Sequence, residues 1–308
     1  MLLQVQDRKG KTLVADGLKF HTYKGAPTVN DLMQSYWAIS KRTDPTRQRW
    51  TLPLQEGQKK ATVLASGKKL SDYGIKDGDT LIFKDLGPQI GYATVFFWEY
   101  FGPMVIFPLM YLCREVVYGV AFQPQPIQTY ATIFWFAHYA KRILETWFVH
   151  NFSHGTMPIA NLFRNCGYYW TFAAWCGYFV CHPKYTAVGQ TQQYVGLALG
   201  VAMELSNLYC HLILANLRKP GVTGYQIPRG FLFDFPGITC ANYFAEIMAW
   251  FGFNIATQSV AGYTFMVCGG GQMVEWAIAK HKRLRRQFDG KEGREKYPRR
   301  WIIMPPFL

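Results

Sequence analysis

Several common sequence signals are missing from this chain of 308 residues. Its seven cysteines are odd in number and form no C-x-x-C pair, so neither a disulfide framework nor a cysteine zinc site is predicted. Acidic residues are few, 19 against 33 lysines and arginines, which leaves a net charge of +14. The first residues, MLLQVQDRKGK, turn polar too early for a signal peptide. Membrane insertion would therefore depend on an internal segment.

Two cofactor patterns are missing as well. No G-x-G-x-x-G follows a strand, so a nucleotide would not be held by a Rossmann fold. His150 and His154 have the spacing of a histidine box, but there is no His-His pair and no second box, as di-iron membrane enzymes require. We interpret these histidines as polar residues at a helix end and predict no metal site. The glycines of Cys268–Gly271 are interpreted as a close helix contact.

Long apolar segments dominate the middle of the chain. Half of all residues are hydrophobic and 17% are aromatic, yet the mean hydropathy is only −0.04 because both ends are polar. The sequence predicts an α-helical polytopic membrane protein with about six spans, at 91–112, 127–149, 167–182, 194–215, 239–255 and 257–277. An even number of spans places both termini on one side, and the basic tail predicts that this side is cytosolic.

A basic block of 280–300, KHKRLRRQFDGKEGREKYPRR, follows the last apolar segment. Such a block can bind nucleic acid. Beside apolar spans it more simply indicates a cytosolic membrane flank or a site for a phosphate-bearing ligand. We favour a membrane flank or a phosphate-ligand site over a nucleic-acid site, and we expect no nucleic-acid partner.

One apolar segment, 127–157, carries a stripe of polar side chains. At helical spacing Tyr139, Arg142 and Thr146 share a face, and His138 and Glu145 flank it. Ionisable groups are costly inside a membrane and usually mark a functional site. The alternative is a structural salt link between Arg142 and Glu145.

Residues 1–86 indicate a small soluble domain. Two short strands about a Lys-Gly turn are followed by a helix that begins after Thr28, with Asp31 completing a capping box, and then by two further strands. This is a β-grasp order, and the stretch LSDYGIKDGDTLIF resembles ubiquitin-like domains. The chain continues into the membrane part, 87–308, without a terminal Gly-Gly, so conjugation is not implied. A plain docking module is the alternative.

Longer motifs carry a second resemblance. They include KRILETWFVHNFSHGTMPIANLFRNCGYYW, NLRKPGVTGYQIPRGFLF, TCANYFAEIMAWFGFNIATQ and the ending PPFL. On these motifs the chain resembles the steroid 5-alpha-reductase family, and within it the very-long-chain trans-2-enoyl-CoA reductases of the endoplasmic reticulum. The resemblance implies a multi-pass protein of that membrane that uses NADPH to reduce the 2,3 double bond of a very-long-chain enoyl-CoA. This is the last step of fatty-acid elongation, so other elongation enzymes are the implied partners.

The resemblance also implies roles for individual residues. Glu99 and Tyr139 correspond to the pair that contacts the substrate carbonyl, where a tyrosine hydroxyl and a neutral carboxyl can stabilise an enolate. The implied NADPH-binding residues are Arg142, Asn207, Arg218, Asn242 and Glu246, with His281, Arg285 and Tyr297 as candidates in the tail. Gln226, Lys280 and Leu284 depart from the steroid enzymes, which have arginine, histidine and tyrosine there. Without the resemblance, Asn242 is as well explained as a helix cap.

Two other functions stay open from the sequence. One is the reduction of a steroid or polyprenol enone, against which the ubiquitin-like stretch and LETWFVHNFSHGTMP argue. The other is a non-catalytic membrane scaffold that docks elongation enzymes through residues 1–86. The consumption of NADPH with an enoyl-CoA would separate both from the favoured function.

Overall fold

The computed structural model of the protein describes residues 1–19, 26–41, 43–58, 60–152, 155–218 and 225–308. The chain forms two compact units. The first runs from Met1 to Gly91 and also takes in the segment around strand β6 (Thr156–Pro158). That segment joins the first unit because β6 pairs antiparallel with β5 (Gln89–Gly91). The unit boundary therefore lies at Gly91, beyond residue 86, at which the sequence placed the domain boundary.

A four-stranded mixed sheet forms the first unit. Its strands are β1 (Leu2–Gln6), β2 (Leu18–Lys19), β3 (Gln48–Thr51) and β4 (Thr80–Asp85), in the order β2-β1-β4-β3, with β1 parallel to β4. Short 3-10 turns lie at Pro45–Arg47 and Leu70–Tyr73. The strand predicted directly after the Lys-Gly turn is wrong, because only one bridge forms there, between Gln6 and Thr12, and the second strand is β2.

Helix α1 (Val29–Ser40) packs its apolar side into the core of this unit. The predicted capping box is confirmed: the Thr28 hydroxyl accepts from the Asp31 backbone N–H at 3.3 Å, and the Asp31 carboxylate accepts from the Thr28 N–H at 2.8 Å. The helix ends where Lys41 adopts a left-handed conformation. Val29 and Leu32 of the helix are fully buried together with the ring of Trp50 on β3.

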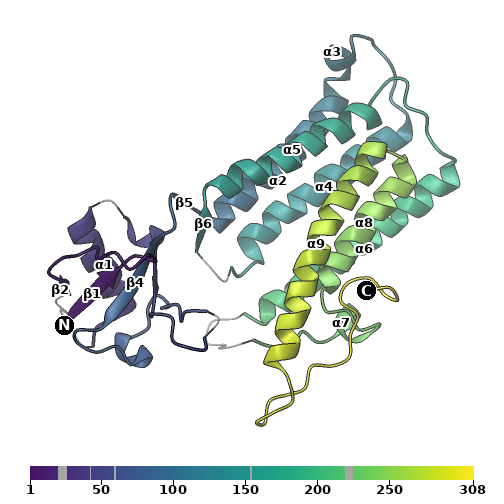
Figure 1. Ribbon diagram of the computed structural model, residues 1–308. Helices are drawn as coiled ribbons and strands as arrows, with labels where there is room; N and C mark the ends of the chain where they lie inside the picture. The colour runs from purple at the N-terminus through teal and green to yellow at the C-terminus, as the bar shows by residue number, and fades with distance from the viewer. Residues whose placement is uncertain (20–25, 42, 59, 153–154, 219–224) are drawn as a thin grey trace. The chain divides into compact units, whose positions relative to one another are not determined.

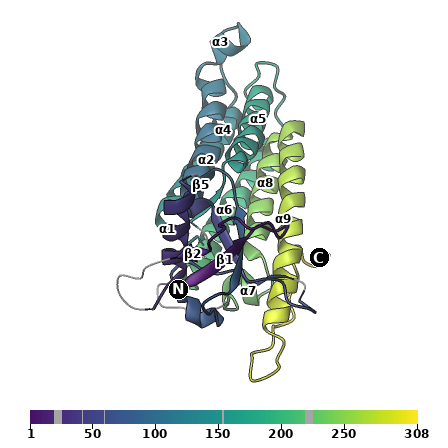
Figure 2. The same ribbon diagram turned by 60° about the vertical axis from the view of Figure 1, so that its left-hand side comes forward.

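The second unit consists mainly of long helices that run side by side (Figures 1 and 2). These are α2 (Tyr92–Leu112), α4 (Pro126–Phe148), α5 (Ala160–Val180), α6 (Gln190–Asn216), α8 (Ala241–Thr257) and α9 (Val260–Gln287). Two short helices, α3 (Arg114–Tyr118) and α7 (Phe231–Asp234), lie at opposite ends of this bundle (Figure 1). Each segment predicted as a span thus folds as a helix.

The lengths of two helices differ from the sequence expectation. Helix α5 begins at Ala160 rather than at 167, and α9 continues to Gln287 rather than ending at 277, so its last turns carry part of the basic block. By length and apolar composition, α2 and α6 qualify as membrane spans among the described residues. Helix α8, with 17 residues, is short for a span, and polar or charged residues interrupt the apolar stretches of α4, α5 and α9.

Close packing of α6 and α8 depends on glycine. A Cβ atom on Gly252 would lie 2.5 Å from the backbone nitrogen of Gly200 and 2.6 Å from the carbonyl oxygen of Gly196. Only residues without a side chain allow the two backbones to approach this closely. The close contact predicted at 269–271 is confirmed at Gly269, where a Cβ would lie 3.0 Å from the Tyr168 hydroxyl of α5, whereas a Cβ on Gly271 would meet nothing within 4 Å.

The long helices alternate in direction along the chain, so the first turns of some lie beside the last turns of others. In Figure 1 the starts of α2, α5 and α8 lie at the same end of the bundle as the last turns of α4, α6 and α9. The predicted site residues from Glu99 to His281 lie in, or directly after, the halves of these helices nearest that end, so the fold brings segments far apart in sequence together there.

Candidate active site

Arg142 of α4 is the centre of a buried polar network. Its Nη1 donates to a Glu145 carboxylate oxygen at 2.6 Å, and its Nη2 donates to the Tyr100 hydroxyl at 3.1 Å. Nδ1 of His211, on α6, lies 3.2 Å from Nη1 and 3.0 Å from the second Glu145 oxygen. The salt link between Arg142 and Glu145 that the sequence offered as an alternative is confirmed. It holds the guanidinium in one orientation.

A second set of contacts joins α4, α6 and α8. Lys141 donates to Asn207 Oδ1 at 2.7 Å and pairs with Glu204 at 2.7 Å. Asn207 in turn donates to the Asn242 carbonyl oxygen at 2.8 Å and, more weakly, to the Glu246 carboxylate at 3.4 Å. Two of the predicted cofactor residues, Asn207 and Glu246, are therefore in contact, although they come from different helices.

The two predicted catalytic residues, Glu99 and Tyr139, both lie next to Tyr100. Glu99 of α2 is buried and accepts a hydrogen bond from Asn165 of α5 at 2.7 Å. Tyr139 is fully buried, and its ring centroid lies 6.2 Å from that of Tyr100 and 5.5 Å from that of Trp135. Within the described part of the chain no hydrogen bond joins Glu99 to Tyr139 directly.

Three buried polar atoms in this region have no partner among the described residues: the Tyr139 hydroxyl, Nε of Arg142 and Oδ1 of Asn242. Glu246, one turn after Asn242 on α8, is near enough to act electrostatically on Tyr139 and Arg142. Unpaired buried polar groups are rare in proteins because each one costs free energy. Three of them on residues from two adjoining helices indicate a site whose ligand supplies the missing hydrogen bonds.

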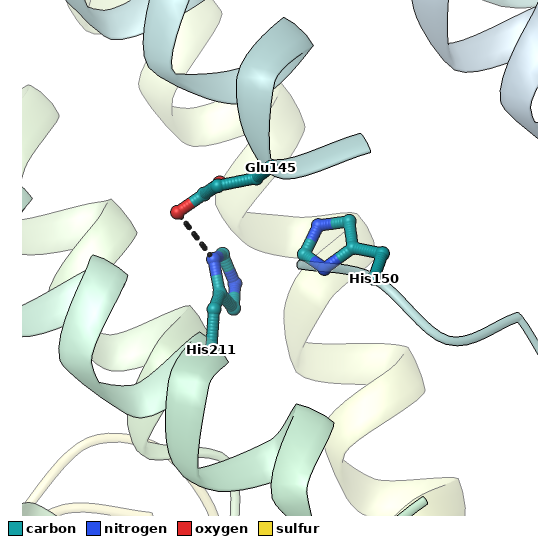
Figure 3. A group of neighbouring side chains, drawn as sticks. All are labelled: Glu145, His150 and His211. Atoms are coloured by element: carbon teal, nitrogen blue, oxygen red, sulfur yellow. Dashed lines mark hydrogen bonds and ion pairs between the residues drawn. The ribbon is translucent and has the colours of Figure 1, made fainter. Parts of the chain in front are cut away.

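Glu145, His150 and His211 also have the residue types of a metal site (Figure 3). Their ligand atoms lie within 4.8 Å of one another. However, the Arg142 guanidinium contacts both Glu145 and His211, so a cation already balances this carboxylate. Metal binding would require Arg142 to move away. Of the histidine pair considered from the sequence, His154 lies outside the described residues.

The tail contributes polar contacts of its own. Thr239 lies just before α8, and its hydroxyl is 2.7 Å from Nδ1 of His281 and 3.0 Å from the Tyr297 hydroxyl, which donates to it. These two candidate cofactor residues therefore tie the tail to the start of α8. Arg285 is exposed, whereas Arg218 donates to the Asn151 carbonyl oxygen at 2.9 Å.

Comparison with known proteins connects this geometry to a family. The family model described as 3-oxo-5-alpha-steroid 4-dehydrogenase matches residues 155–308. A very-long-chain enoyl-CoA reductase of Dictyostelium discoideum is 46% identical over 229 residues, which is 74% of each chain. The chain belongs to the family of very-long-chain enoyl-CoA reductases. A probable very-long-chain enoyl-CoA reductase of Caenorhabditis elegans is 38% identical over 280 residues, 87% of each chain.

The chain is also similar to a relative with a lower sequence identity, whose name again refers to enoyl-CoA reductase. The trans-2,3-enoyl-CoA reductase-like protein of Mus musculus is 35% identical over 219 residues, 68% of this chain and 61% of the mouse chain. The resemblance found in the sequence motifs is thus confirmed. As a member of these families, the protein is a helical membrane oxidoreductase, for which a nicotinamide cofactor is the general expectation.

Several partners of the residues at this candidate site were not predicted from the sequence. His211, Tyr100 and Asn165 contact Arg142 or Glu99, yet they come from α6, α2 and α5. Each lies inside a largely apolar helix. A polar residue in an apolar segment was the available signal, the same one that identified Tyr139 and Arg142. What the sequence could not supply is which helices face one another.

Proposed function

We propose that the protein catalyses the NADPH-dependent reduction of the trans-2,3 double bond of very-long-chain enoyl-CoA, the last step of the fatty-acid elongation cycle. The names of its relatives support enoyl-CoA as the substrate class. The observation that carries the proposal is the group of unpaired buried atoms on Tyr139, Arg142 and Asn242, because these are residues to which the sequence resemblance gave substrate and cofactor roles.

Reduction of an enoyl thioester requires that the negative charge developing on the carbonyl oxygen be stabilised. When bound, NADPH would supply the hydride that adds to C3, and negative charge then develops on the thioester oxygen. The free Tyr139 hydroxyl can donate a hydrogen bond to that oxygen, and a protonated Glu99 can donate a second. Asn165 holds the Glu99 carboxyl in place. The aromatic wall around Tyr139 excludes water, which strengthens both contacts.

The proposed cofactor residues fit the chemistry of a dinucleotide. Arg218 is suited to phosphate oxygens, because a guanidinium binds oxyanions in a bidentate manner. Arg142 has its Nη atoms bonded to Glu145 and Tyr100, which leaves its unpaired Nε to donate to one cofactor oxygen. The unpaired oxygen of Asn242 and the carboxylate of Glu246 can accept from an amide or a ribose hydroxyl. Asn207 positions Glu246, and His281 and Tyr297 hold the tail against α8, which leaves Arg285 facing outward.

We further propose that the protein is a multi-pass protein of the endoplasmic reticulum membrane with about six spans and both termini in the cytosol. The basic segment at the end of α9 supports this orientation. Protease treatment of sealed microsomes should remove tags placed at either terminus. Protection of one tag would contradict the orientation.

In the same proposal, residues 1–86 form a ubiquitin-like β-grasp domain and 87–308 the catalytic domain. The sheet order, with β1 parallel to β4 at its centre, supports the β-grasp assignment. A domain of this kind would dock other elongation enzymes. This role is tested by whether a chain without it still co-purifies with them.

A substrate screen tests the proposed reaction. Purified protein in detergent is supplied with NADPH and, separately, with a trans-2-enoyl-CoA, the matching saturated acyl-CoA, a steroid enone and a polyprenol enone. We expect NADPH oxidation with the enoyl-CoA alone. Oxidation confined to an enone would assign a different reductase activity. No oxidation with any substrate by folded protein would favour a scaffold.

A further inference from the structure

A cavity of about 370 Å³ lies between α4 and α6, and neither Glu99 nor Tyr139 is among the residues that line it. Its wall is mostly apolar and is formed by Tyr130, Ile133, Phe134 and Ala137 of α4 and by Leu197, Val201, Leu205 and Leu208 of α6. Ile133, Val201 and Leu205 are exposed, so the cavity opens on the surface of the second unit. Helix α6 qualifies as a membrane span, so lipid chains can enter through this opening. We call it the α4–α6 cavity.

Three polar side chains line the α4–α6 cavity toward the last turns of α4. Nδ1 of His138 lies 2.6 Å from one Glu204 carboxylate oxygen. Nζ of Lys141 lies 2.7 Å from the other Glu204 oxygen and donates to Asn207 Oδ1, also at 2.7 Å. The ammonium therefore balances the carboxylate, and this polar end of the cavity has no net charge when His138 is neutral.

The polar end has unused hydrogen-bonding capacity. His138 is only 3% exposed, and since a carboxylate can only accept, the bond to Glu204 places the proton of the neutral ring on Nδ1 and leaves Nε2 as an acceptor. No hydrogen bond joins Nε2 to another residue that the structure describes. Lys141 has three N–H groups and uses two of them, since the next carboxylate, Glu145, is 4.0 Å from Nζ. Leaving such atoms unpaired beside lipid chains is costly, because a membrane interior offers no water in place of a partner.

A hydroxyl group fits the polar end better than a charged group does. It can donate to Nε2 of His138 and accept from Lys141 at the same time. Both side chains bond the same carboxylate, so one small group can lie near both. A bound carboxylate or phosphate would be repelled by Glu204, and a bound amine would be repelled by Lys141.

The apolar wall has the length to hold an aliphatic chain. The lining residues run from Tyr130 to Lys141 on α4 and from Leu197 to Leu208 on α6, which is about 16 Å along each helix at 1.5 Å per residue. We propose that the α4–α6 cavity binds a neutral single-chain lipid with a terminal hydroxyl, a long-chain alcohol. Its hydroxyl lies between His138 and Lys141, and its chain lies along the apolar wall. The inference does not depend on the proposed reduction.

Photolabelling tests this site. The probe is dodecanol with a diazirine at the methyl end of its chain, added to purified full-length protein in phospholipid nanodiscs. We expect label in 130–141 and 197–208. Unlabelled dodecanol should compete about tenfold more strongly than dodecane at the same mole fraction in the bilayer, because dodecane cannot form the hydrogen bonds to the imidazole and the ammonium. Dodecanoate and cholesterol should also compete less well than dodecanol. Equal competition by dodecanol and dodecane, or stronger competition by dodecanoate or cholesterol, would overturn the proposal.

Ala137→Phe tests whether the label reports the cavity. Ala137 is an exposed residue of the cavity wall, so the larger side chain should fill the space and remove the label from both segments. Ala202→Phe is the matched control, because Ala202 is an exposed alanine of α6 that does not line the cavity. It should keep the label. Label that persists in Ala137→Phe would show that the alcohol binds elsewhere.

His138→Phe separates the hydroxyl contact from the chain contact. The aromatic ring is retained but Nε2 is removed, so the variant should still be labelled and should lose most of its preference for dodecanol over dodecane. A full tenfold preference in His138→Phe would contradict the proposal. If this variant does not fold, the competition series and Ala137→Phe still decide the outcome. Every readout is binding, so a lack of reductase activity would count against the proposed function alone.

Discussion

Replacing Tyr139 by phenylalanine should change stability and activity in opposite directions. The Tyr139 side chain is fully buried, and its hydroxyl has no hydrogen-bond partner among the described residues. A buried hydroxyl without a partner typically costs about 1 to 3 kcal/mol. Tyr139→Phe removes this cost and keeps the ring contacts with Trp135 and Tyr100. We expect the free energy of unfolding of the ligand-free protein to stay the same or to rise by about 1 kcal/mol.

The catalytic effect is expected to be much larger. If the Tyr139 hydroxyl donates to the developing enolate oxygen, its loss removes an oxyanion donor, which typically lowers kcat by about 10² to 10³. The assay is NADPH oxidation under single-turnover conditions, so that product release does not mask the chemical step. Thermal unfolding of the same ligand-free sample in detergent gives the stability.

Tyr168→Phe provides the matched control. The Tyr168 hydroxyl donates to the Phe265 carbonyl oxygen at 3.1 Å, so its removal should lower the free energy of unfolding by about 1 kcal/mol while kcat stays near wild type. The reasoning is refuted if Tyr139→Phe retains wild-type kcat with chemistry rate-limiting. It is also refuted if Tyr139→Phe destabilises the protein as much as Tyr168→Phe does.

Three further predictions concern other parts of the site. Glu99→Gln should retain more activity than Glu99→Ala, because an amide can still donate to the substrate oxygen; equal kcat values in the two variants would remove Glu99 from this role. Arg218→Ala should raise KM for NADPH about tenfold or more if a charge-assisted contact is lost, and an unchanged NADPH titration would assign Arg218 to loop structure. Deleting residues 1–84 should leave kcat largely intact, because each proposed site residue lies at Glu99 or beyond; turnover lost while NADPH still binds would place the first unit in the active site.

The helices could be predicted from the sequence because their signal is local. A run of about 20 apolar residues, or a Thr28–Asp31 capping box, depends on neighbours in the chain, and the helices formed where these signals occur. The polar stripe of Tyr139 and Arg142 followed from helical periodicity alone. Both residues are buried at the site, as the cost of placing them in lipid requires.

Contacts between helices could not be predicted in the same way. A close approach was expected at 269–271 and occurs at Gly269, but the tightest one lies between Gly252 of α8 and the glycines of α6, which the sequence did not single out. A glycine does not reveal which neighbour it faces. The same reason explains why His211 was missed as a partner of Arg142. The extension of α9 into the basic block was missed because charged residues end a hydropathy signal without ending a helix.

The transfer of labelled hydride tests the central claim most directly. Purified protein is incubated with a trans-2-enoyl-CoA and NADPH that carries deuterium at the transferable C4 position, and the product is analysed by mass spectrometry with fragmentation. We expect a saturated acyl-CoA with one deuterium at C3, formed at a strongly reduced rate by Tyr139→Phe. A saturated product without deuterium at C3, or no saturated product from folded protein that binds NADPH, would contradict it.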